Sequence, residues 1–276
     1  MSAPERPAAE TVRYRNQATQ RVLKVLLAFA INAKPRGVTE LSRELGMNKN
    51  MIHRALSTLM AENYLVRDPS GELYQLGYRL LMLGSGAPGE FDIVALARPA
   101  LEQLHALTAE SVFLSIIVGR NRVTIDDIQA QGPRVLRSLR GHPVALHCTK
   151  MSRVLLAHLS DTEVGSYLTA AAPLARAQNV RDPPSETAAG VWQDVAAIRA
   201  KPYVLWRNPH HSSAAYAIFP IRDVSGRAHA IITIGGPRER FDLPRIEEQL
   251  PRMRSILDPL EHEARLFPAP PFMVEA

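Results

Sequence analysis

The segment GVTELSRELGMNKNMIHRALSTLMAENYLVRDPSGELYQLG, residues 37–77, contains two short helical patterns that almost touch and a hairpin pattern directly after them. Leu41 and Leu45 lie four residues apart and predict one apolar face for the first helix. Gly46 follows at once and suits a helix end that turns through positive φ. Asn48 is a good N-cap for the next helix. Such a compact pair of helices is typical of a protein that places one helix in a DNA groove.

The second helix of this pair, predicted over residues 49–65, has an apolar face formed by Ile52, Leu56 and Leu59. Its opposite face carries side chains that suit nucleic acid. Asparagine fits an adenine edge and arginine a guanine edge, while lysine and serine bind phosphates. The candidate DNA-contacting residues of the segment are Thr39, Asn48, Lys49, Asn50, Met51, His53, Arg54, Ser57 and Arg67.

Some of these candidates have a second interpretation. Thr39 is also expected to cap the first helix of the pair. Met51 suits either a thymine methyl group or a gap between the helices. Arg67 lies at the base of the hairpin whose turn is DPSG, and a hairpin after a recognition helix is a wing. An ordinary three-helix bundle is the structural alternative for the segment.

The region upstream and the charge distribution favour DNA binding. A further helix is predicted from Thr19, because Val22, Val25, Leu26 and Phe29 follow the i, i+3, i+4, i+7 spacing. Residues 1–84 contain 12 Lys/Arg and 7 Asp/Glu, a net charge of +5, whereas the remaining residues contain 21 and 20. A localised excess of positive charge indicates a nucleic-acid binder, although a solvated basic surface gives the same count.

Composition sets wider limits. A chain of 276 residues is long enough for two domains with separate cores. Residues 1–18 are polar and rich in Pro and Ala, without the apolar core of a secretory signal, and are expected to form a disordered lead-in. No apolar run is long enough to span a membrane. The single cysteine, Cys148, excludes an intramolecular disulfide and suits a reducing cytoplasm. No nucleotide-binding glycine motif and no cofactor are indicated.

The segments GVTELSRELGMNKNMIHRALSTLMAENYLVRDPSGELYQLGYRLLMLGS, LARPALEQLHALTAESVFLSIIVG, GHPVALHCTKMSRVLLAHL and GGP together resemble the IclR-type bacterial transcriptional regulators. The resemblance extends over nearly the whole chain from about Thr19. It implies a homodimer or a dimer of dimers whose C-terminal domain binds a small effector. Two-fold symmetry would then require a palindromic double-stranded DNA operator.

The expected fold class is α+β. A winged helix-turn-helix at residues 19–84 is joined by a helical linker, residues 85–109, to an effector-binding and oligomerisation domain at residues 110–276. The resemblance makes this last domain GAF-like, with a mainly antiparallel sheet flanked by helices. Strands are predicted in SVFLSIIVG, RVTIDDIQA, RVLRSLR and SAAYAIFPIRDVSGRAHAIITIGG. Pro99 is expected to kink the helix at 91–109 or to start a new one, Thr149 to cap a helix, and Ser160–Glu163 to form a capping box.

In the family the effector pocket is built from two loops, here HPVALHCTKM and LWRNPHHSSAAY, and from the strand at residues 233–237. The second loop departs from the family pattern, because it is basic and rich in imidazole where relatives have acidic residues, glycine and cysteine. The candidate effector-binding residues are Leu139, His142, His147, Cys148, Met151, Trp206, Arg207, His210, His211, Tyr216 and Thr233.

The chemistry of these loops suggests a class of effector. Arg207 with one or two histidines favours a carboxylate, and Trp206 and Tyr216 could hold a ring between them. The hypothesis is a small aromatic or hydroxyaromatic acid, as occurs in catabolic pathways.

Other functions remain open on the sequence. Cys148 beside His147 could serve a hydrolase fused to a DNA-binding module, but neighbouring residues seldom have nucleophile-to-base geometry. His210 and His211 suggest a metal, but no third ligand stands out and no metal site is predicted. A non-specific architectural DNA binder would not need the long second domain. The residues favour a non-enzymatic cytoplasmic regulator.

Overall fold

The protein is described here by a computed structural model that covers residues 16–31, 34–85, 92–132, 134–136, 140–171, 174, 187–207, 214–270 and 272. The chain divides into two compact units, one ending at Gly89 and the other beginning at Glu90. Each unit has its own apolar core. The predicted lead-in up to residue 15 lies outside the described residues.

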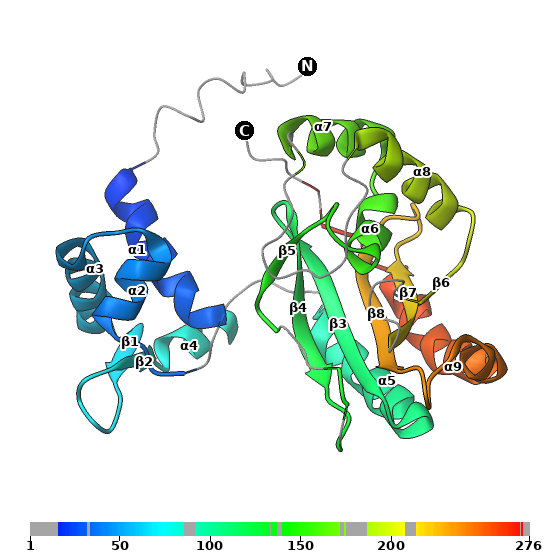
Figure 1. The fold of residues 1–276 in the computed structure, drawn as a ribbon, viewed down its shortest axis with the longest axis horizontal. Coiled ribbons are helices and arrows are strands. Elements are labelled where there is room, and N and C mark those ends of the chain that lie inside the picture. The colour runs from blue at the N-terminus through cyan, green and yellow to red at the C-terminus, as the bar shows by residue number, and fades with distance from the viewer. Residues whose placement is uncertain are drawn as a thin grey trace. The chain divides into compact units, whose positions relative to one another are not determined.

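The described residues of the first unit form three helices, a two-stranded wing and a short fourth helix (Figure 1). Its elements are α1 (Gln17–Ile31), α2 (Val38–Leu45), α3 (Lys49–Ala61), β1 (Leu65–Arg67), β2 (Tyr74–Leu76) and α4 (Arg79–Ser85). Helix α1 begins two residues before the predicted Thr19. The Asn16 side chain caps it by accepting hydrogen bonds from the amides of Ala18 and Thr19 at 2.9 and 3.3 Å.

The turn between α2 and α3 has the predicted glycine and asparagine caps. Gly46 has φ 63° and its N–H donates to the Ser42 carbonyl, and the Asn48 side chain accepts from the Met51 amide. The prediction that Thr39 caps α2 was wrong. Gly37 is the N-cap, and Thr39 lies within the first turn, because the helix already begins at Val38. Helix α3 ends at Ala61, four residues before its predicted end.

Arg36 connects three parts of the first unit. Its side chain is only 2% exposed and donates to the Ala28 carbonyl of α1 at 2.8 Å. The same guanidinium pairs with Glu40 and Glu44 of α2. Its backbone exchanges two hydrogen bonds with Tyr74 of β2, at 2.8 and 2.9 Å. One residue therefore fixes the wing and α2 against α1.

The second unit is a six-stranded antiparallel sheet in the order β5-β4-β3-β8-β7-β6, with helices on both faces (Figure 1). The strands are β3 (Ser111–Val118), β4 (Asn121–Ile128), β5 (Pro143–Ala145), β6 (Val204–Arg207), β7 (Ala214–Arg222) and β8 (Ala228–Pro237). The helices are α5 (Ile93–Thr108), α6 (Lys150–Ala157), α7 (Asp161–Ala171), α8 (Ala188–Arg199) and α9 (Leu243–Ala264). This is the predicted α+β fold.

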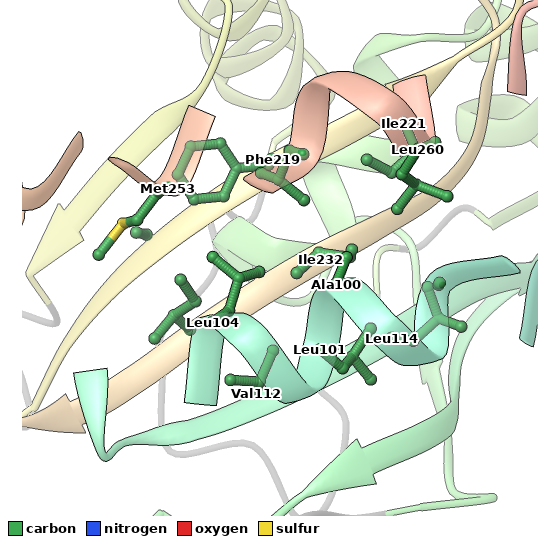
Figure 2. Close-up of a cluster of buried hydrophobic side chains, with 14 of the residues drawn as sticks. Ala100, Leu101, Leu104, Val112, Leu114, Phe219, Ile221, Ile232, Met253 and Leu260 are labelled. Atoms are coloured by element: carbon green, nitrogen blue, oxygen red, sulfur yellow. The ribbon is translucent and has the colours of Figure 1, made fainter. Parts of the chain in front are cut away.

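The two faces of the sheet have separate cores. Helices α5 and α9 cover the face here called the α5 face, where Leu101, Leu104, Phe219 and Met253 pack together (Figure 2). Helices α6, α7 and α8 cover the opposite face, here called the α6 face. Because helices cover both faces, an apolar strand residue enters one core or the other according to the alternation of the strand.

The structure decides two sequence expectations for the second unit. Of the two alternatives at Pro99, a new helix is excluded, because α5 runs through this residue from Ile93 to Thr108. The strand expected in RVLRSLR is not formed at residues 134–136, and residues 137–139 lie outside the described part. The strand beside β4 is instead the short β5. The Thr149 cap and the Ser160–Glu163 capping box were predicted correctly.

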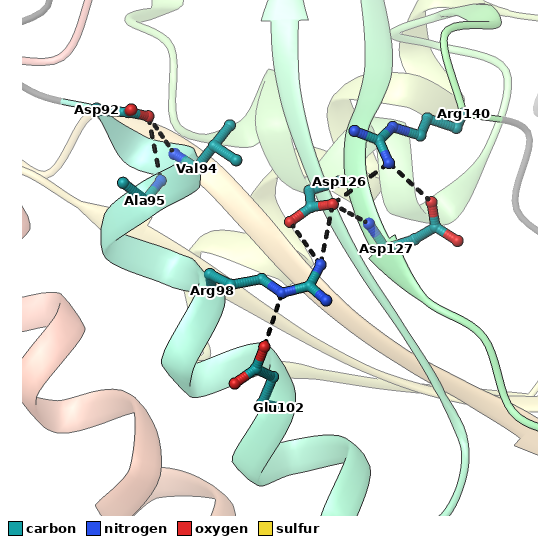
Figure 3. Close-up of polar contacts among 8 residues, drawn as sticks. All are labelled: Asp92, Val94, Ala95, Arg98, Glu102, Asp126, Asp127 and Arg140. Carbon is teal, nitrogen blue, oxygen red and sulfur yellow. Dashed lines mark hydrogen bonds and ion pairs between the residues drawn. The ribbon is translucent and has the colours of Figure 1, made fainter.

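A β-bulge in β4 places neighbouring polar side chains on opposite faces. Ser115 pairs with Thr124, whereas Leu114 pairs with Asp126, so the register shifts between them. Asp126 therefore points to the α5 face, where its carboxylate binds Arg98 of α5 and also Arg140 (Figure 3). Thr124 stays on the α6 face. Bulges redirect side chains in this way.

Replacing Arg36 with methionine should destabilise the first unit by about 2 kcal/mol, because the α1 carbonyl and two carboxylates lose a charged partner. Both tryptophans, Trp192 and Trp206, lie in the second unit. Urea unfolding of Arg36→Met should therefore give two different results. The part of the circular dichroism signal that comes from the helices of the first unit should be lost at a lower urea concentration, while the tryptophan fluorescence transition stays unchanged. Arg43→Met, at an exposed site on α2, is the control. Equal shifts in both variants would contradict the role given to Arg36.

Candidate DNA-binding and effector-binding sites

The polar face of α3 is exposed along its N-terminal half. Ile52, Ala55, Leu56 and Leu59 are buried in the core of the first unit. Five of the predicted residues, all exposed, lie outside this buried face: Lys49, Asn50, His53, Arg54 and Ser57. These five predicted residues thus share one solvent-facing surface, here called the α3 surface. It combines two cations with amide, imidazole and hydroxyl groups, which are the side-chain types that a recognition helix uses to bind base edges and phosphates.

The remaining candidates of the first unit have more varied positions. Asn48 is exposed, but its side-chain oxygen Oδ1 caps α3 by accepting a hydrogen bond from the Met51 amide. Met51 is half-buried and is not among the partly buried apolar side chains that pack on this core within the described residues, whereas Met47 and Met60 are. Thr39 is exposed on α2. The Arg67 guanidinium lies 4.1 Å from the centre of the Tyr74 ring on the wing, which orients it as a cation–π contact does.

In the second unit, the α6 face brings together several candidates from separate segments. Trp206 and Tyr216 pair across β6 and β7, and Met151 of α6 packs with both against the same core. Thr233 pairs with Ile218 of that core and is fully buried. No contact in the described residues joins His142 to this group. Leu139, His210 and His211 lie outside the described residues.

Trp206 and Tyr216 form a stack and do not surround a space. Their ring centres are 5.3 Å apart with an interplanar angle of 25°. The expectation of a ligand ring held between them was therefore wrong, because two stacked rings leave no room for a third. The Tyr216 ring also lies close over Gly235, where an added Cβ would come within 2.9 Å of it. Glycine at this position lets the tyrosine lie flat on the sheet.

Arg207 lies on the wrong face to bind a ligand beside these rings. It pairs with Ala215, whose side chain belongs to the core of the α5 face, and Trp206 precedes it on the α6 face. Successive residues of a strand point to opposite faces. The expectation that Arg207 supplies the cation of the effector site is therefore not met by the register of β6.

His147 is held between Tyr167 and Cys148. The Tyr167 hydroxyl lies 3.2 Å from the His147 amide and 2.7 Å from its Nδ1, and Nε2 lies 3.5 Å from the Cys148 sulfur. Burial raises the pKa of Tyr167 to about 12. The hydroxyl accepts a hydrogen bond from the amide. The Cys148 side chain is only 1% exposed, and a buried thiol is shielded from substrate, which argues against a nucleophile and base at this pair.

A polar cluster on the α6 face was missed by the sequence reasoning. Arg122 of β4 donates to Ser115 and Thr124, each at 3.0 Å, and to Ser152 of α6 at 3.3 Å. The two strand hydroxyls lie 3.0 Å apart, and Ser152 lies 2.8 Å from the hydroxyl of the cap residue Thr149. Only the alternation in RVTIDD, which places Arg122 and Thr124 on one face, could have indicated it.

Helix α6 is joined to α8 through Asp194. This carboxylate accepts from Lys150 at 2.8 Å and forms a charge-assisted bond with Arg153. Burial raises the pKa of Asp194, but the hydrogen bonds and charges of the two cations outweigh burial and hold the pKa below its ordinary value. Arg153 also donates to the His147 carbonyl at 2.8 Å, so the network fixes the loop that leads into α6.

The described residues contain neither a metal-binding cluster nor a membrane-spanning helix. No three His, Cys, Asp or Glu side chains among them gather closely enough to hold a metal ion. No helix among them has the length and apolar character needed to cross a membrane.

A winged helix-turn-helix followed by a helix-flanked antiparallel sheet is the architecture of a DNA-binding regulator with an effector domain. Residues 18–69 match the IclR helix-turn-helix domain, and residues 87–259 match the domain described as bacterial transcriptional regulator IclR C-terminal. The chain belongs to the IclR family of bacterial transcriptional regulators.

Several relatives support this assignment. The HTH-type transcriptional regulator XynR of Escherichia coli (strain K12) is 30% identical over 152 residues, which span 55% of this chain and 60% of XynR. The HTH-type transcriptional regulator BhcR of Paracoccus denitrificans (strain Pd 1222) is 27% identical over 83% of this chain and 81% of BhcR. The Pca regulon regulatory protein of Pseudomonas putida is 24% identical over 83% of this chain and 77% of its own length.

Solved structures share the fold. An IclR transcriptional regulator from Alicyclobacillus acidocaldarius matches with a TM-score of 0.72 and 18% identity, covering 92% of this chain and 99% of its own. An IclR homolog from Microbacterium hydrocarbonoxydans, complexed with 4-hydroxybenzoate, matches with a TM-score of 0.69 and 18% identity, covering 91% and 100%.

Replacing Asp194 with asparagine should weaken the second unit by about 2 kcal/mol at neutral pH, because two charged hydrogen bonds are lost. Since the pKa of Asp194 is lower in the folded protein, its contribution is present above the ordinary aspartate value of 3.8 and disappears as pH falls through the folded pKa. The stability difference between wild type and Asp194→Asn should therefore shrink below that value. Tryptophan fluorescence during urea unfolding measures it. Asp161→Asn, at a residue whose side chain is 76% exposed, is the control, and an equal loss there would contradict the prediction.

Proposed function

We propose that the protein is a cytoplasmic regulator that binds a palindromic operator through the α3 surface and responds to an aromatic or hydroxyaromatic acid. The observation that carries the DNA-binding part is the α3 surface itself. Lys49, Asn50 and Arg54 are exposed together, while the other face of the same helix is buried. Thr39 and Arg67, both exposed, are the proposed phosphate contacts, and Met51 is the proposed partner for a thymine methyl group.

A homodimer, or a dimer of dimers, is the proposed assembly. Leu23 and Leu27 lie four residues apart on α1 and are 52% and 62% exposed, so they form one apolar strip outside the core of the first unit. An exposed apolar strip on a helix is a suitable contact for a second copy. Two copies related by a two-fold axis would present two α3 surfaces to a palindromic site.

The effector is proposed to bind on the α6 face. Thr233, Met151 and the Trp206–Tyr216 pair supply apolar and aromatic surface there, next to the His147–Cys148 loop. An IclR homolog of the same fold is complexed with 4-hydroxybenzoate, which supports an aromatic acid. The burial of Cys148 argues against the alternative of a hydrolase.

Strand β4 is the proposed connection between effector and DNA. Arg122 lies on its α6 face, and four residues later Asp126 holds Arg98 of α5 on the other face (Figure 3). Helix α5 is the first helix after the DNA-binding unit. An effector that prefers one position of β4 would therefore bias the position of α5 and shift the population of DNA-binding arrangements.

Substitutions on the α3 surface should weaken operator binding. Arg54→Ala should lower affinity for the specific site by about 10- to 100-fold and relax its sequence preference, because a bidentate base contact is worth about 1–3 kcal/mol. Lys49→Ala should lower the salt dependence of binding by about one unit of slope. Fluorescence anisotropy on the intergenic DNA beside the gene measures both.

Lys24→Ala is the matched control, since it removes one positive charge from an exposed position on α1. It should leave the affinity for the specific site within about twofold, because surface charge away from the contact acts only weakly. Comparable losses in Lys24→Ala and Arg54→Ala would show that net charge, and not the α3 surface, determines binding.

An aromatic acid should change the affinity for operator DNA, whereas its neutral amide should not. Benzoate and 4-hydroxybenzoate, compared with the corresponding benzamides, form a suitable panel for the anisotropy assay. A specific complex that no acid alters would contradict the proposed effector class and leave the DNA-binding function in place.

Asp126→Asn separates effector binding from the response. The substitution removes the charge that holds Arg98 while leaving the α6 face unchanged. Calorimetry should show that the variant still binds the acid, and anisotropy should show a reduced effect of that acid on DNA affinity. A full response in Asp126→Asn would contradict transmission through β4.

A further inference from the structure

Three arginines are buried in the described part of the chain, and they differ in their partners. Arg36 is 2% exposed and pairs with two glutamates. Arg153 is 5% exposed and pairs with Asp194. Arg122 is 7% exposed, and no carboxylate of the described residues lies within ion-pair distance of it. Its only partners there are the hydroxyls of Ser115, Thr124 and Ser152.

This arrangement leaves the charge of Arg122 without an opposite charge. A guanidinium stays protonated in proteins, and a buried charge is costly unless a counter-charge accompanies it. Burial lowers the pKa of Arg122 to about 10, which still leaves it charged at neutral pH. Hydroxyl groups orient the guanidinium through hydrogen bonds but do not neutralise it. The Nε and Nη1 groups make all three bonds, so the Nη2 edge is the one available to a further acceptor.

The N-terminal end of α6 adds positive charge beside Arg122. Ser152 belongs to the first turn of α6, and Thr149 caps that helix. The N-terminal end of a helix carries partial positive charge and attracts anions. The partial positive charge at this end of α6 disfavours a nearby cation such as Arg122. An anion in contact with both the helix end and Arg122 would be stabilised by both. The N-terminal end of α6 and Arg122 therefore both favour an anionic ligand group.

The Thr233 hydroxyl is a candidate second contact for a ligand whose anionic group lies at Arg122. Its hydroxyl is buried without a hydrogen-bond partner among the described residues. Thr233 pairs with Phe113, and Ser115 lies two residues further along the same strand. Diagonal neighbours in a sheet are ~7–8 Å apart, a separation that one substituted benzene ring can bridge. The aromatic side chain of Phe113 lies on the same face, opposite Thr233 and two residues from Ser115.

We propose that Arg122 binds the carboxylate of the effector, with the Ser115, Thr124 and Ser152 hydroxyls holding the guanidinium in place. The acid would lie along the α6 face with its ring beside Phe113 and its far end at Thr233. Arg207, which the register of β6 directs to the other face, has no part in this contact. The assignment rests on the proposed function in one respect, namely that the effector is an organic acid.

Calorimetric titration of the full-length protein without DNA tests the assignment. The probes are 4-hydroxybenzoate and its neutral analogue 4-hydroxybenzamide. Wild type should bind the acid at least about tenfold more tightly, because only the carboxylate gains charge-assisted bonds. Arg122→Gln should lower affinity for the acid by about 10- to 100-fold and leave the amide nearly unaffected. Arg122→Lys should give an intermediate loss, since lysine keeps the charge but not the planar geometry.

Arg207→Gln is the matched comparison, because it removes the arginine that the loop sequence had suggested. It should bind the acid like wild type. Loss of binding in Arg207→Gln with retention in Arg122→Gln would overturn the assignment, and so would equal binding of acid and amide by wild type. Thermal unfolding of each variant checks folding. If Arg122→Gln does not fold, the acid–amide comparison in wild type and the Arg122→Lys titration still decide the question.

Operator binding, measured on the same preparations, separates the possible failures. If Arg122→Gln binds the acid as tightly as wild type does, Arg122 is not part of the effector site, and the proposed regulatory function is unaffected. Folded wild type that binds operator DNA but neither this acid nor benzoate would overturn both the aromatic-acid class and the Arg122 contact.

Discussion

The alternation of side chains in a sheet that is covered on both faces governs the second unit. Apolar strand residues enter either the core under α5 and α9 or the core under α6, α7 and α8, because helices cover both faces of the sheet. A shift of one residue therefore moves a side chain from one site to another. Trp206 and Arg207 are neighbours in sequence but belong to different faces, and this alone separates the ring stack from the cation that the loop sequence had placed beside it.

The bulge in β4 is the point where this alternation is interrupted, and it gives the strand two functions. Thr124 stays with Arg122 on the α6 face, while Asp126 turns to the α5 face and holds Arg98. In a regular strand these two residues would share one face. Because interiors are close-packed, β4 cannot shift at one face without moving the contacts at the other. The strand is thus suited to connect a ligand on one face with a helix on the other.

The parts of the fold that could be predicted from the sequence depend on local interactions. Asn48, Gly46, Thr149 and the Ser160–Glu163 box act within one helical turn, so their residue types and spacing are sufficient. The hydrophobic spacing likewise indicated α3 and its exposed face. Arg122 could not be recognised in the same way, because its burial depends on Ser152, thirty residues later. A strand arginine beside a turn is ordinarily solvated, and only the tertiary partners show otherwise.

The partners of the buried arginines also bear on how a ligand could act. Carboxylates already neutralise Arg36 and Arg153, so these residues hold helices together whether or not a ligand is present. Hydroxyls hold Arg122 in place and leave its charge available. A ligand changes the state of a regulator only through a difference in affinity between two arrangements. A carboxylate that binds Arg122 of β4 also interacts with the N-terminal end of α6. Its binding energy therefore depends on the position of β4 relative to α6. Structural arginines lack that dependence, and Arg122 is therefore the one whose ligand could act as a signal.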